Sequence, residues 1–354
     1  MSTSDVLVVK SRLRDYEVVF TKDWAADLSR QADGAYFLVD RRVWELYQVS
    51  LRPLVPEGRL LLVDATEEQK TLERCYGLIE DLAARRIRRN QALVAVGGGI
   101  LQDITAFIAT ILFRGVRWLF CPTTLLAQAD SCVGSKSSLN LGKYKNLLGT
   151  FNPPAVIWID GAFLETLPIE ALKSGIGEIL HFYLVAGHEA AQELADEYDT
   201  LLANPRGLLD HVRRSLLIKK RVVEIDEFDQ GERNLLNYGH TFGHAIETLT
   251  NYAVSHGQAV TLGMDLANFL SVRYGYLSRE SCDALHRLLE KNLPRVTIRE
   301  EQLDELLGIL GRDKKNTDSG VTCILTDGPG AMRKVRLPLD GTLKASLAEY
   351  FRAA

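Results

Sequence analysis

The first 160 or so residues alternate short apolar runs with longer segments of mixed polarity. The short runs are rich in β-branched and aromatic residues, which predicts strands. They cover residues 6–9, 16–20, 36–39, 60–63, 92–96, 118–120 and 156–159. Between several of these runs apolar positions recur at helical spacing, as Leu72, Cys75 and Leu78 do within residues 67–86. This alternation of strands and helices favours an α/β domain built on a largely parallel sheet.

From residue 162 onward the apolar pattern becomes helical. The segments with helical spacing are residues 170–186, 190–204, 208–227 and 258–274. Near the end, a β-like piece within residues 321–336 predicts a hairpin that closes the second half. A chain of 354 residues also exceeds the usual size of a single core. We therefore predict two domains, an α/β domain at residues 1–160 and a mostly α-helical domain at residues 161–354.

The composition is that of an ordinary soluble globular protein, with 46% hydrophobic and 25% charged residues. A net charge of −4 provides no field for nucleic acid or an anionic membrane, so local positive charge must meet any anionic ligand. The chain shows neither a secretory signal nor an apolar run of ~20 residues that would cross a bilayer. Its five cysteines are scattered, without a Cys-x-x-Cys pair. We expect a cytoplasmic protein with free thiols and with neither a nucleic-acid nor a membrane partner.

Three consecutive glycines at residues 97–99 form a candidate phosphate-binding turn. They follow a predicted buried strand and precede an apolar helix, and such a helix N-terminus favours negative charge. The segment lacks the Gly-x-Gly-x-x-Gly pattern of the common dinucleotide fingerprint. A tight turn without a ligand explains the glycines about as well as a cofactor site does.

Polar and charged residues stand in apolar surroundings between residues 122 and 149. Burying such groups is costly unless they are paired or bind a ligand. Lys136, Lys145 and Asn146 could provide charge and donors to a phosphate, and Asp130 could accept a proton. A solvated, glycine-rich loop is the alternative interpretation.

Three of the seven histidines fall between residues 231 and 257. His240 and His244 are four residues apart, the helical spacing at which two imidazoles can meet one metal ion, and His256 follows. Arg233 and Asn237 have the same spacing and could present a carboxylate-binding fork beside them. A helix with histidines in a core is the simpler interpretation. The crowding of five such residues favours a site, although spacing does not determine which histidines bind the metal.

Taken together, these segments resemble the 3-dehydroquinate synthases and the wider sugar phosphate cyclases. The resemblance covers nearly the whole chain, and the order and spacing of its motifs are more specific than any one of them. The matching stretches are Glu67-x-x-Lys70, residues 97–103, 113–115, 122–130, 145–146, 163–168, 177–178, 233–244, 255–257 and 313–315. The resemblance implies an N-terminal NAD-binding α/β domain followed by a mostly helical metal- and substrate-binding domain.

The resemblance also implies which residues surround NAD. Three would lie around its adenosine part: Asp40, Glu67 and Lys70. Three would hold the pyrophosphate and ribose: Gly98, Gly99 and Asp103. Four would surround the nicotinamide end: Thr123, Thr124, Phe163 and Thr166.

The metal ligands implied by the resemblance are Glu178, His240 and His256, an oxygen and two nitrogens suited to a catalytic Zn²⁺, or Co²⁺, that keeps a position open. His244 would then lie near the substrate phosphate. The phosphate would be held by Lys136, Asn146, His244 and Lys315, with Arg114 reaching from a second subunit of a homodimer. The polyol would be contacted by Asp130, Lys145, Lys219 and Asn237, and the carboxylate by Arg233.

The family reaction combines transient oxidation by NAD, phosphate elimination, re-reduction and an intramolecular aldol closure. Arg233 favours a substrate with a carboxylate, hence 3-deoxy-arabino-heptulosonate 7-phosphate and the shikimate pathway. Two departures keep a specialised cyclase open, of the amino-dehydroquinate or 2-epi-5-epi-valiolone synthase type. His181 replaces a substrate-contacting lysine, and Ser137-Ser138 replaces Thr-Ala. A metal-dependent alcohol or glycerol dehydrogenase of similar fold is a further alternative, which the phosphate-binding residues disfavour.

Overall fold

The computed structural model describes residues 5–142, 144–187, 189–312 and 320–353. The chain divides into two compact units. The first, called the N-unit here, comprises Met1–Leu167 together with Lys219–Phe228. The second, the C-unit, comprises Pro168–Ile218 and Asp229–Ala354. The domain boundary after residue 160 stays a proposal.

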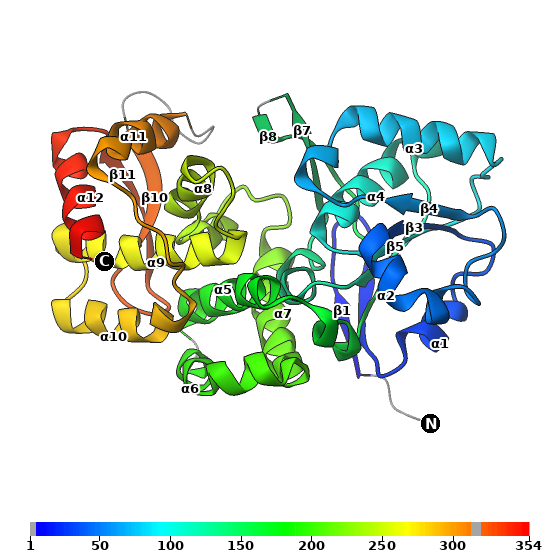
Figure 1. The fold of residues 1–354 in the computed structure, drawn as a ribbon, viewed down its shortest axis with the longest axis horizontal. Helices are drawn as coiled ribbons and strands as arrows, with labels where there is room; N and C mark the ends of the chain where they lie inside the picture. Colours follow the sequence, from blue (N-terminus) through cyan, green and yellow to red (C-terminus); the bar gives the residue numbers. More distant parts are fainter. Residues whose placement is uncertain (1–4, 143, 188, 313–319, 354) are drawn as a thin grey trace. The chain divides into compact units, whose positions relative to one another are not determined.

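The N-unit is built on a seven-stranded sheet in the order β1-β2-β9-β6-β5-β3-β4 (Figure 1). Its strands are β1 (Asp5–Val9), β2 (Tyr16–Phe20), β3 (Tyr36–Asp40), β4 (Leu60–Val63), β5 (Leu93–Gly97), β6 (Trp118–Pro122) and β9 (Val156–Ile159). Only the β1–β2 pair within this sheet is antiparallel. Every residue of β5, β6 and β9 is buried, as expected of central parallel strands covered on both faces. The strands and the largely parallel sheet predicted from the sequence are confirmed.

The helices of the N-unit are α1 (Trp24–Ser29), α2 (Arg41–Leu51), α3 (Leu72–Ala84) and α4 (Gly99–Ile111). The helix predicted from residue 67 is wrong at its start. Glu67–Gln69 forms a separate 3₁₀ turn, η1, because Lys70 leaves helical geometry and Thr71 caps α3. Thr71 accepts a hydrogen bond from the backbone N–H of Arg74, which fixes the first turn of α3.

A hairpin of β7 (Lys136–Leu141) and β8 (Tyr144–Phe151) follows a π-helix, η3 (Ala127–Ser131). The two strands pair with each other in antiparallel register, and Asn140 of β7 also forms an isolated parallel bridge with Thr71. The sequence did not predict these strands, because most of their residues are polar and only Ser137 and Leu139 are buried.

The C-unit is mostly helical, which confirms the prediction (Figure 1). Its helices are α5 (Ile169–Ala186), α6 (Ala190–Ala203), α7 (Leu208–Ile225), α8 (His240–Leu249), α9 (His256–Arg273), α10 (Arg279–Leu289), α11 (Leu303–Gly311) and α12 (Gly341–Ala353). The end of α7, from Lys219 to Ile225, and the turn that follows lie within Lys219–Phe228 and so belong to the N-unit. β10 (Gly320–Thr326) and β11 (Met332–Pro338) form the predicted antiparallel hairpin. Over the described part of the chain, no helix has the length and apolarity needed to cross a membrane.

Candidate functional site

Three side chains of the C-unit converge on one point. Glu178 comes from the middle of α5, and His240 and His256 are the first residues of α8 and α9. Nε2 of His256 lies 3.0 Å from Oε1 of Glu178, and Nε2 of His240 lies 3.4 Å from the same oxygen. One ligand atom from each residue lies within 4.8 Å of the others. The structure thus brings together the carboxylate and the two imidazoles, and their role as metal ligands stays a proposal.

Glycines next to these residues make the convergence possible. A Cβ on Gly177 would overlap the carbonyl oxygen of Gly257, and one on Gly257 would overlap that of Ser174. The backbones of α5 and α9 therefore meet directly beside Glu178 and His256. Gly239 turns the chain into α8 with φ +77°, a conformation that favours glycine. The backbone geometry at these glycines thus fixes the backbone positions from which the three side chains extend.

The electrostatics of this cluster suit a bound cation. Burial raises the pKa of Glu178, but His240 and His256 outweigh it and hold that pKa well below its ordinary value. Burial lowers the pKa of His256, but hydrogen bonds with Glu178 and Glu247 raise it to about 10. An anionic carboxylate facing two imidazole nitrogens is stabilised by positive charge, which a divalent metal ion would supply in place of protons. One oxygen and two nitrogen ligands match the donor set of a catalytic zinc site.

Two further histidines lie near the cluster. His181 is 1% exposed, and its Nδ1 is 3.6 Å from Oε2 of Glu178. His244 is exposed on α8, with its ring centre 5.5 Å from those of His240 and His256. His244 is not one of the three residues around Glu178, but it belongs to a second group of possible ligands with Glu247 and His256. Helical spacing alone, which pairs His240 with His244, therefore does not describe the cluster around Glu178.

Arg233 and Asn237 lie in η6 (Glu232–Asn237), a 3₁₀ helix with three residues per turn. Residues four apart do not share a face in such a helix, so the proposed fork does not follow from their spacing. Arg233 is buried, whereas Asn237 is half-buried and donates to the carbonyl of Asn234 at 2.8 Å. A small cavity of about 70 Å³ is lined by Asn234, Asn237, Thr241, Thr322, Cys323, Ile324 and Lys334. Lys315, predicted to bind phosphate, lies outside the described residues.

In the N-unit, the glycine-rich turn leads into α4. Gly98 occupies the N-cap, and no side chain among the described residues caps this helix. A Cβ on Gly98 would come within 3.0 Å of Cγ2 of Thr124. Thr124 itself accepts from the N–H of Ala127, and Thr123 is buried. The first N–H groups of α4 are thus available for an anionic group such as a pyrophosphate.

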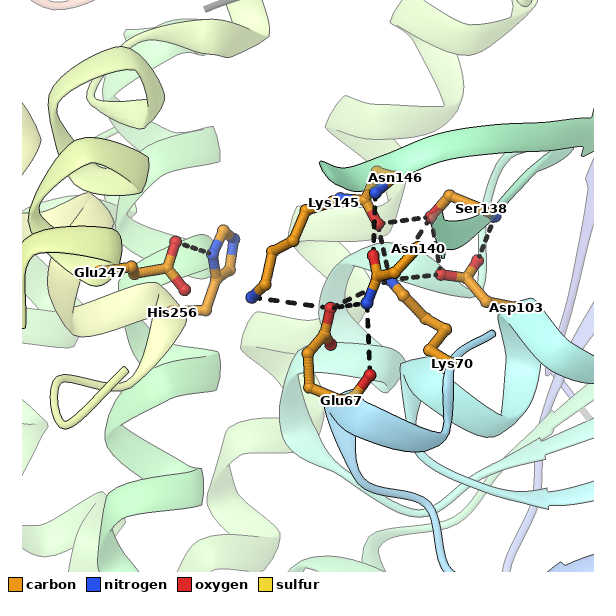
Figure 2. Close-up of polar contacts among 9 residues, drawn as sticks. All are labelled: Glu67, Lys70, Asp103, Ser138, Asn140, Lys145, Asn146, Glu247 and His256. Carbon is orange, nitrogen blue, oxygen red and sulfur yellow. Dashed lines mark hydrogen bonds and ion pairs between the residues drawn. The ribbon is translucent and has the colours of Figure 1, made fainter. Parts of the chain in front are cut away.

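A polar network surrounds Lys70 and ties the β7–β8 hairpin to the rest of the N-unit (Figure 2). The ammonium group of Lys70 lies 3.1 Å from Oδ2 of Asp103 and 2.7 Å from Oδ1 of Asn146. The Ser138 hydroxyl donates to Asp103 at 2.9 Å. Burial raises the pKa of Asp103, and Lys70 opposes this rise. Lys70, predicted near the adenosine, is therefore in direct contact with Asn146, a predicted phosphate ligand, and Asp103 is linked to Asn146 through Lys70 and Ser138.

The edge of this network is formed by Glu67 (Figure 2). Asn140 donates to the Glu67 carboxylate at 2.9 Å, and the Lys145 ammonium lies 3.6 Å from it. The sequence analysis did not identify Ser138 or Asn140 as network members. The only signal was that polar residues occupy a segment flanked by buried strands.

Of the remaining N-unit residues, Asp130 and Lys219 form a close ion pair. The Lys219 ammonium donates to the Asp130 carboxylate at 2.6 Å and to the Asp130 carbonyl at 2.8 Å. The Lys219 side chain is 7% exposed. Lys136 is exposed at the start of β7. Arg114 is exposed in η2 (Leu112–Arg114), where it adopts φ +63°, an uncommon left-handed conformation for a residue other than glycine.

Three of the residues predicted to lie near NAD contact other residues of the protein. Asp40 caps α2 by accepting from the N–H of Arg42 at 2.8 Å, and burial raises its pKa. The Phe163 ring is fully buried, with its centre 5.0 Å from that of Tyr47. The Thr166 hydroxyl lies 2.8 Å from the hydroxyl of Tyr47.

Comparison with known proteins places these observations in a family. Residues 60–174 match the family model of the 3-dehydroquinate synthase N-terminal domain, and residues 175–316 match that of the C-terminal domain. The 3-dehydroquinate synthase of Methylococcus capsulatus is 38% identical over 301 residues, which cover 83% of each chain.

Solved structures agree with the fold. A 2-deoxy-scyllo-inosose synthase complexed with carbaglucose-6-phosphate, NAD⁺ and Co²⁺ superposes with a TM-score of 0.85 at 23% identity, covering 98% of this chain and 99% of the other. A 2-epi-5-epi-valiolone synthase from Streptomyces hygroscopicus with NAD⁺ and Zn²⁺ bound gives 0.83 at 25% identity, covering 99% and 100%. These likenesses confirm the predicted fold class. Because both family models match and a relative of 38% identity spans most of the chain, this protein belongs to the 3-dehydroquinate synthase family.

Proposed function

We propose that this protein converts 3-deoxy-arabino-heptulosonate 7-phosphate into 3-dehydroquinate and phosphate. The observation that carries the proposal is the convergence of Glu178, His240 and His256 within 4.8 Å in a member of this family. Its relatives of 30–38% identity are 3-dehydroquinate synthases, which supports this substrate. In this role the enzyme is a carbon–oxygen lyase that depends on NAD and a divalent metal.

The cofactors have matching sites in the two units. NAD would place its pyrophosphate at the N-terminus of α4, beside Gly98 and Gly99, and Zn²⁺ or Co²⁺ would be held by Glu178, His240 and His256. When bound, NAD supplies a reversible hydride acceptor that is regenerated in each cycle, and the metal ion supplies a Lewis acid at a substrate hydroxyl. The remaining steps fall to the side chains of this chain.

Substrate recognition requires a dianionic phosphate to be bound by a protein of net charge −4. We assign this task to Lys136 and Asn146 of the N-unit and to His244 of the C-unit, with Lys315 added from the sequence. Arg233, buried and always charged, is assigned to the substrate carboxylate, because a guanidinium matches that group in a bidentate manner. Asn237 is assigned to a ring hydroxyl.

Proton transfer in the N-unit is assigned to Asp130. Lys219 donates one hydrogen bond to the Asp130 carboxylate and one to its backbone carbonyl, and these bonds orient the carboxylate as a proton acceptor for a substrate hydroxyl. Lys145, whose contact with Glu67 is 3.6 Å long, is assigned to the polyol. The bound substrate has to replace or share these contacts.

One observation keeps a specialised cyclase as the second candidate. His181, at the position where the resemblance expects a substrate-contacting lysine, is buried and faces Glu178. A hydroxyl on the substrate ring would therefore lack the lysine ammonium group that the resemblance leads us to expect. An amino-analogue cyclase or a 2-epi-5-epi-valiolone synthase would fit this difference.

The test is phosphate release from a panel of seven-carbon sugar phosphates in the presence of NAD and Co²⁺. We expect turnover of the carboxylated heptulosonate phosphate without net NADH. Release only from sedoheptulose 7-phosphate or from an amino analogue would replace this function by the second candidate. Stoichiometric NADH without phosphate would point to a dehydrogenase. Arg233→Ala should reduce kcat/KM for the carboxylated substrate at least ~100-fold, by loss of a charged hydrogen-bond partner.

We also propose a cytoplasmic homodimer in which Arg114 of one subunit reaches the phosphate of the other. The free state of all five cysteines supports a reducing compartment. Mixing Arg114→Ala subunits with subunits that carry a different inactivating change tests whether Arg114 acts in the site of the other subunit. Recovered activity in the mixed dimer is the expected result, and no recovery would contradict a shared site.

A further inference from the structure

Glu247 lies on α8, two turns after His240, and its side chain is 13% exposed. Oε2 of Glu247 lies 3.1 Å from Nδ1 of His256 (Figure 2). The other nitrogen of that ring, Nε2, lies 3.0 Å from Oε1 of Glu178. His256 is therefore held between two carboxylates, one on each nitrogen.

An ionised carboxylate accepts hydrogen bonds and does not donate them, so the Glu247 contact places a proton on Nδ1 of His256. Protonation of Nδ1 leaves Nε2 of a neutral ring as the ligand atom, directed toward Glu178. The hydrogen-bond network thus assigns the tautomer needed to bind a metal from Nε2.

The other two proposed ligands show the same arrangement. Nδ1 of His240 lies 3.2 Å from the carbonyl oxygen of Tyr238, again leaving Nε2 toward Glu178. The second oxygen of Glu178 faces Nδ1 of His181 at 3.6 Å. Each of the two histidines is thus oriented by an acceptor at its Nδ1, Glu247 for His256 and the Tyr238 carbonyl for His240. For His256 this task is performed by the carboxylate of Glu247.

We propose that Glu247 is a positioning residue of the metal site. It fixes the ring and the tautomer of His256 and makes Nε2 a stronger donor to the cation. With Glu178 it also brings two negative charges, which balance the two charges of a divalent ion. This inference rests on the proposed function only in requiring that Glu178, His240 and His256 bind a metal ion.

A competing arrangement uses Glu247 itself as a ligand, because His244, Glu247 and His256 form a second set of atoms within 4.8 Å. That site would use Nδ1 of His256 and would leave its Nε2 against Glu178. His244 is exposed, whereas the Glu178 side chain is 3% exposed. The more deeply buried set provides the stronger binding site, and we therefore place Glu247 behind the ligand.

The experiment measures the dissociation constant of Co²⁺ by chelator competition, together with the visible spectrum of the bound ion. Glu247→Gln keeps the shape of the side chain but removes its charge, and it should weaken Co²⁺ binding about 10- to 100-fold. The spectrum should keep its three-ligand character, and the metal-free protein should keep its melting temperature. Glu247→Asp should recover part of the affinity. The matched control is Glu232→Gln, which makes the same charge change at an exposed position of the C-unit and should leave affinity unchanged.

Glu178→Gln distinguishes the possible failures. If it abolishes Co²⁺ binding while Glu247→Gln and Glu247→Ala bind normally, the positioning role is wrong and the proposed metal site stands. If Glu178→Gln binds normally while Glu247→Gln does not, the ion occupies the set with His244, and both the positioning role and the proposed site are wrong. Normal binding by all variants would refute the metal site as a whole.

Discussion

The candidate sites in the two units are held by different means. In the C-unit, Glu178 and His256 are positioned by helices whose backbones meet at Gly177 and Gly257. In the N-unit, the β7–β8 hairpin is held by polar side chains around Lys70. A site held by backbone contact tolerates no added side-chain atom, because backbone atoms cannot rotate away from it as a flexible side chain can. A side-chain network adjusts more readily, but it fails when one charged member is removed.

The largest expected effect follows from adding one methyl group at the helix crossing. A Cβ at Gly257 would overlap the carbonyl oxygen of Ser174, and neither backbone can move without displacing α5 or α9. We expect Gly257→Ala to lower the free energy of unfolding by about 3 kcal/mol or more and to abolish Co²⁺ binding. Urea unfolding and metal titration measure the two effects.

Gly308→Ala is the matched control in the same unit. Gly308 lies in α11, and a Cβ there would meet no atom within 4 Å. Alanine should raise stability by roughly 0.5–1 kcal/mol, because glycine is a poor helix former. If both substitutions had equal effects, backbone contact would not be what positions the proposed metal ligands.

The second expected effect concerns the N-unit. Lys70→Met leaves the Asp103 carboxylate, 19% exposed, without its cation. Removing one partner of a buried ion pair costs about 3 kcal/mol, and the loss should be accompanied by faster hydrogen exchange in residues of the β7–β8 hairpin. Lys145→Met, which removes an ammonium group that is 37% exposed, should cost less than about 1 kcal/mol.

The stability of the Lys70→Met variant should depend on pH in a direction that can be measured. Burial already raises the pKa of Asp103, and loss of Lys70 raises it further. The folded variant then binds a proton that the unfolded chain releases. Its stability should therefore increase as pH falls through the raised pKa of Asp103, and adding Asp103→Asn should remove this dependence. Unchanged stability across this range would mean that Lys70 does not support Asp103.

The contrast between the units also explains what could be predicted from the sequence. The strands of this sheet were predicted closely because each is a short run made mostly of apolar residues, and the bounds of β2, β4 and β9 agree with the prediction. The β7–β8 hairpin was missed because its position depends on Asp103 and Lys70, which contact Ser138 and Asn146 of the hairpin from other segments. Its own apolar pattern is too weak to specify a strand.

The same limit applies to the metal cluster. Periodicity paired His240 with His244, since spacing reports one helix at a time. Glu178 lies in α5, and only the resemblance connected it to histidines of α8 and α9. The glycines at the crossing were visible in the sequence, but their partners across the interface were not. Glu247 was missed because its contact with His256 joins two helices through a turn.

The smallest expected effect tests whether a polar network of the C-unit that does not contact the proposed metal ligands can disturb them. Asp265 of α9 accepts from Tyr350 of α12 at 2.7 Å and lies 3.0 Å from Nδ1 of His286 of α10. The hydrogen bond to Asp265 raises the pKa of His286, against the opposing effect of burial. The stabilisation is therefore complete below the unfolded pKa of histidine and is lost as pH rises through the higher folded value.

His286→Asn should remove this pH dependence at a cost of only about 0.5 kcal/mol below pH 6, since the His286 side chain is 48% exposed and solvent screens the pair. Co²⁺ affinity should not change, because backbone contacts of α9 with α5 and α8, and not its link to α10, position His256. Urea unfolding at several pH values and a Co²⁺ titration measure both quantities. Weaker Co²⁺ binding by this variant would mean that the C-unit, like the N-unit, depends on distant polar contacts to hold its proposed site residues. The two units would then differ only in how much they rely on such contacts.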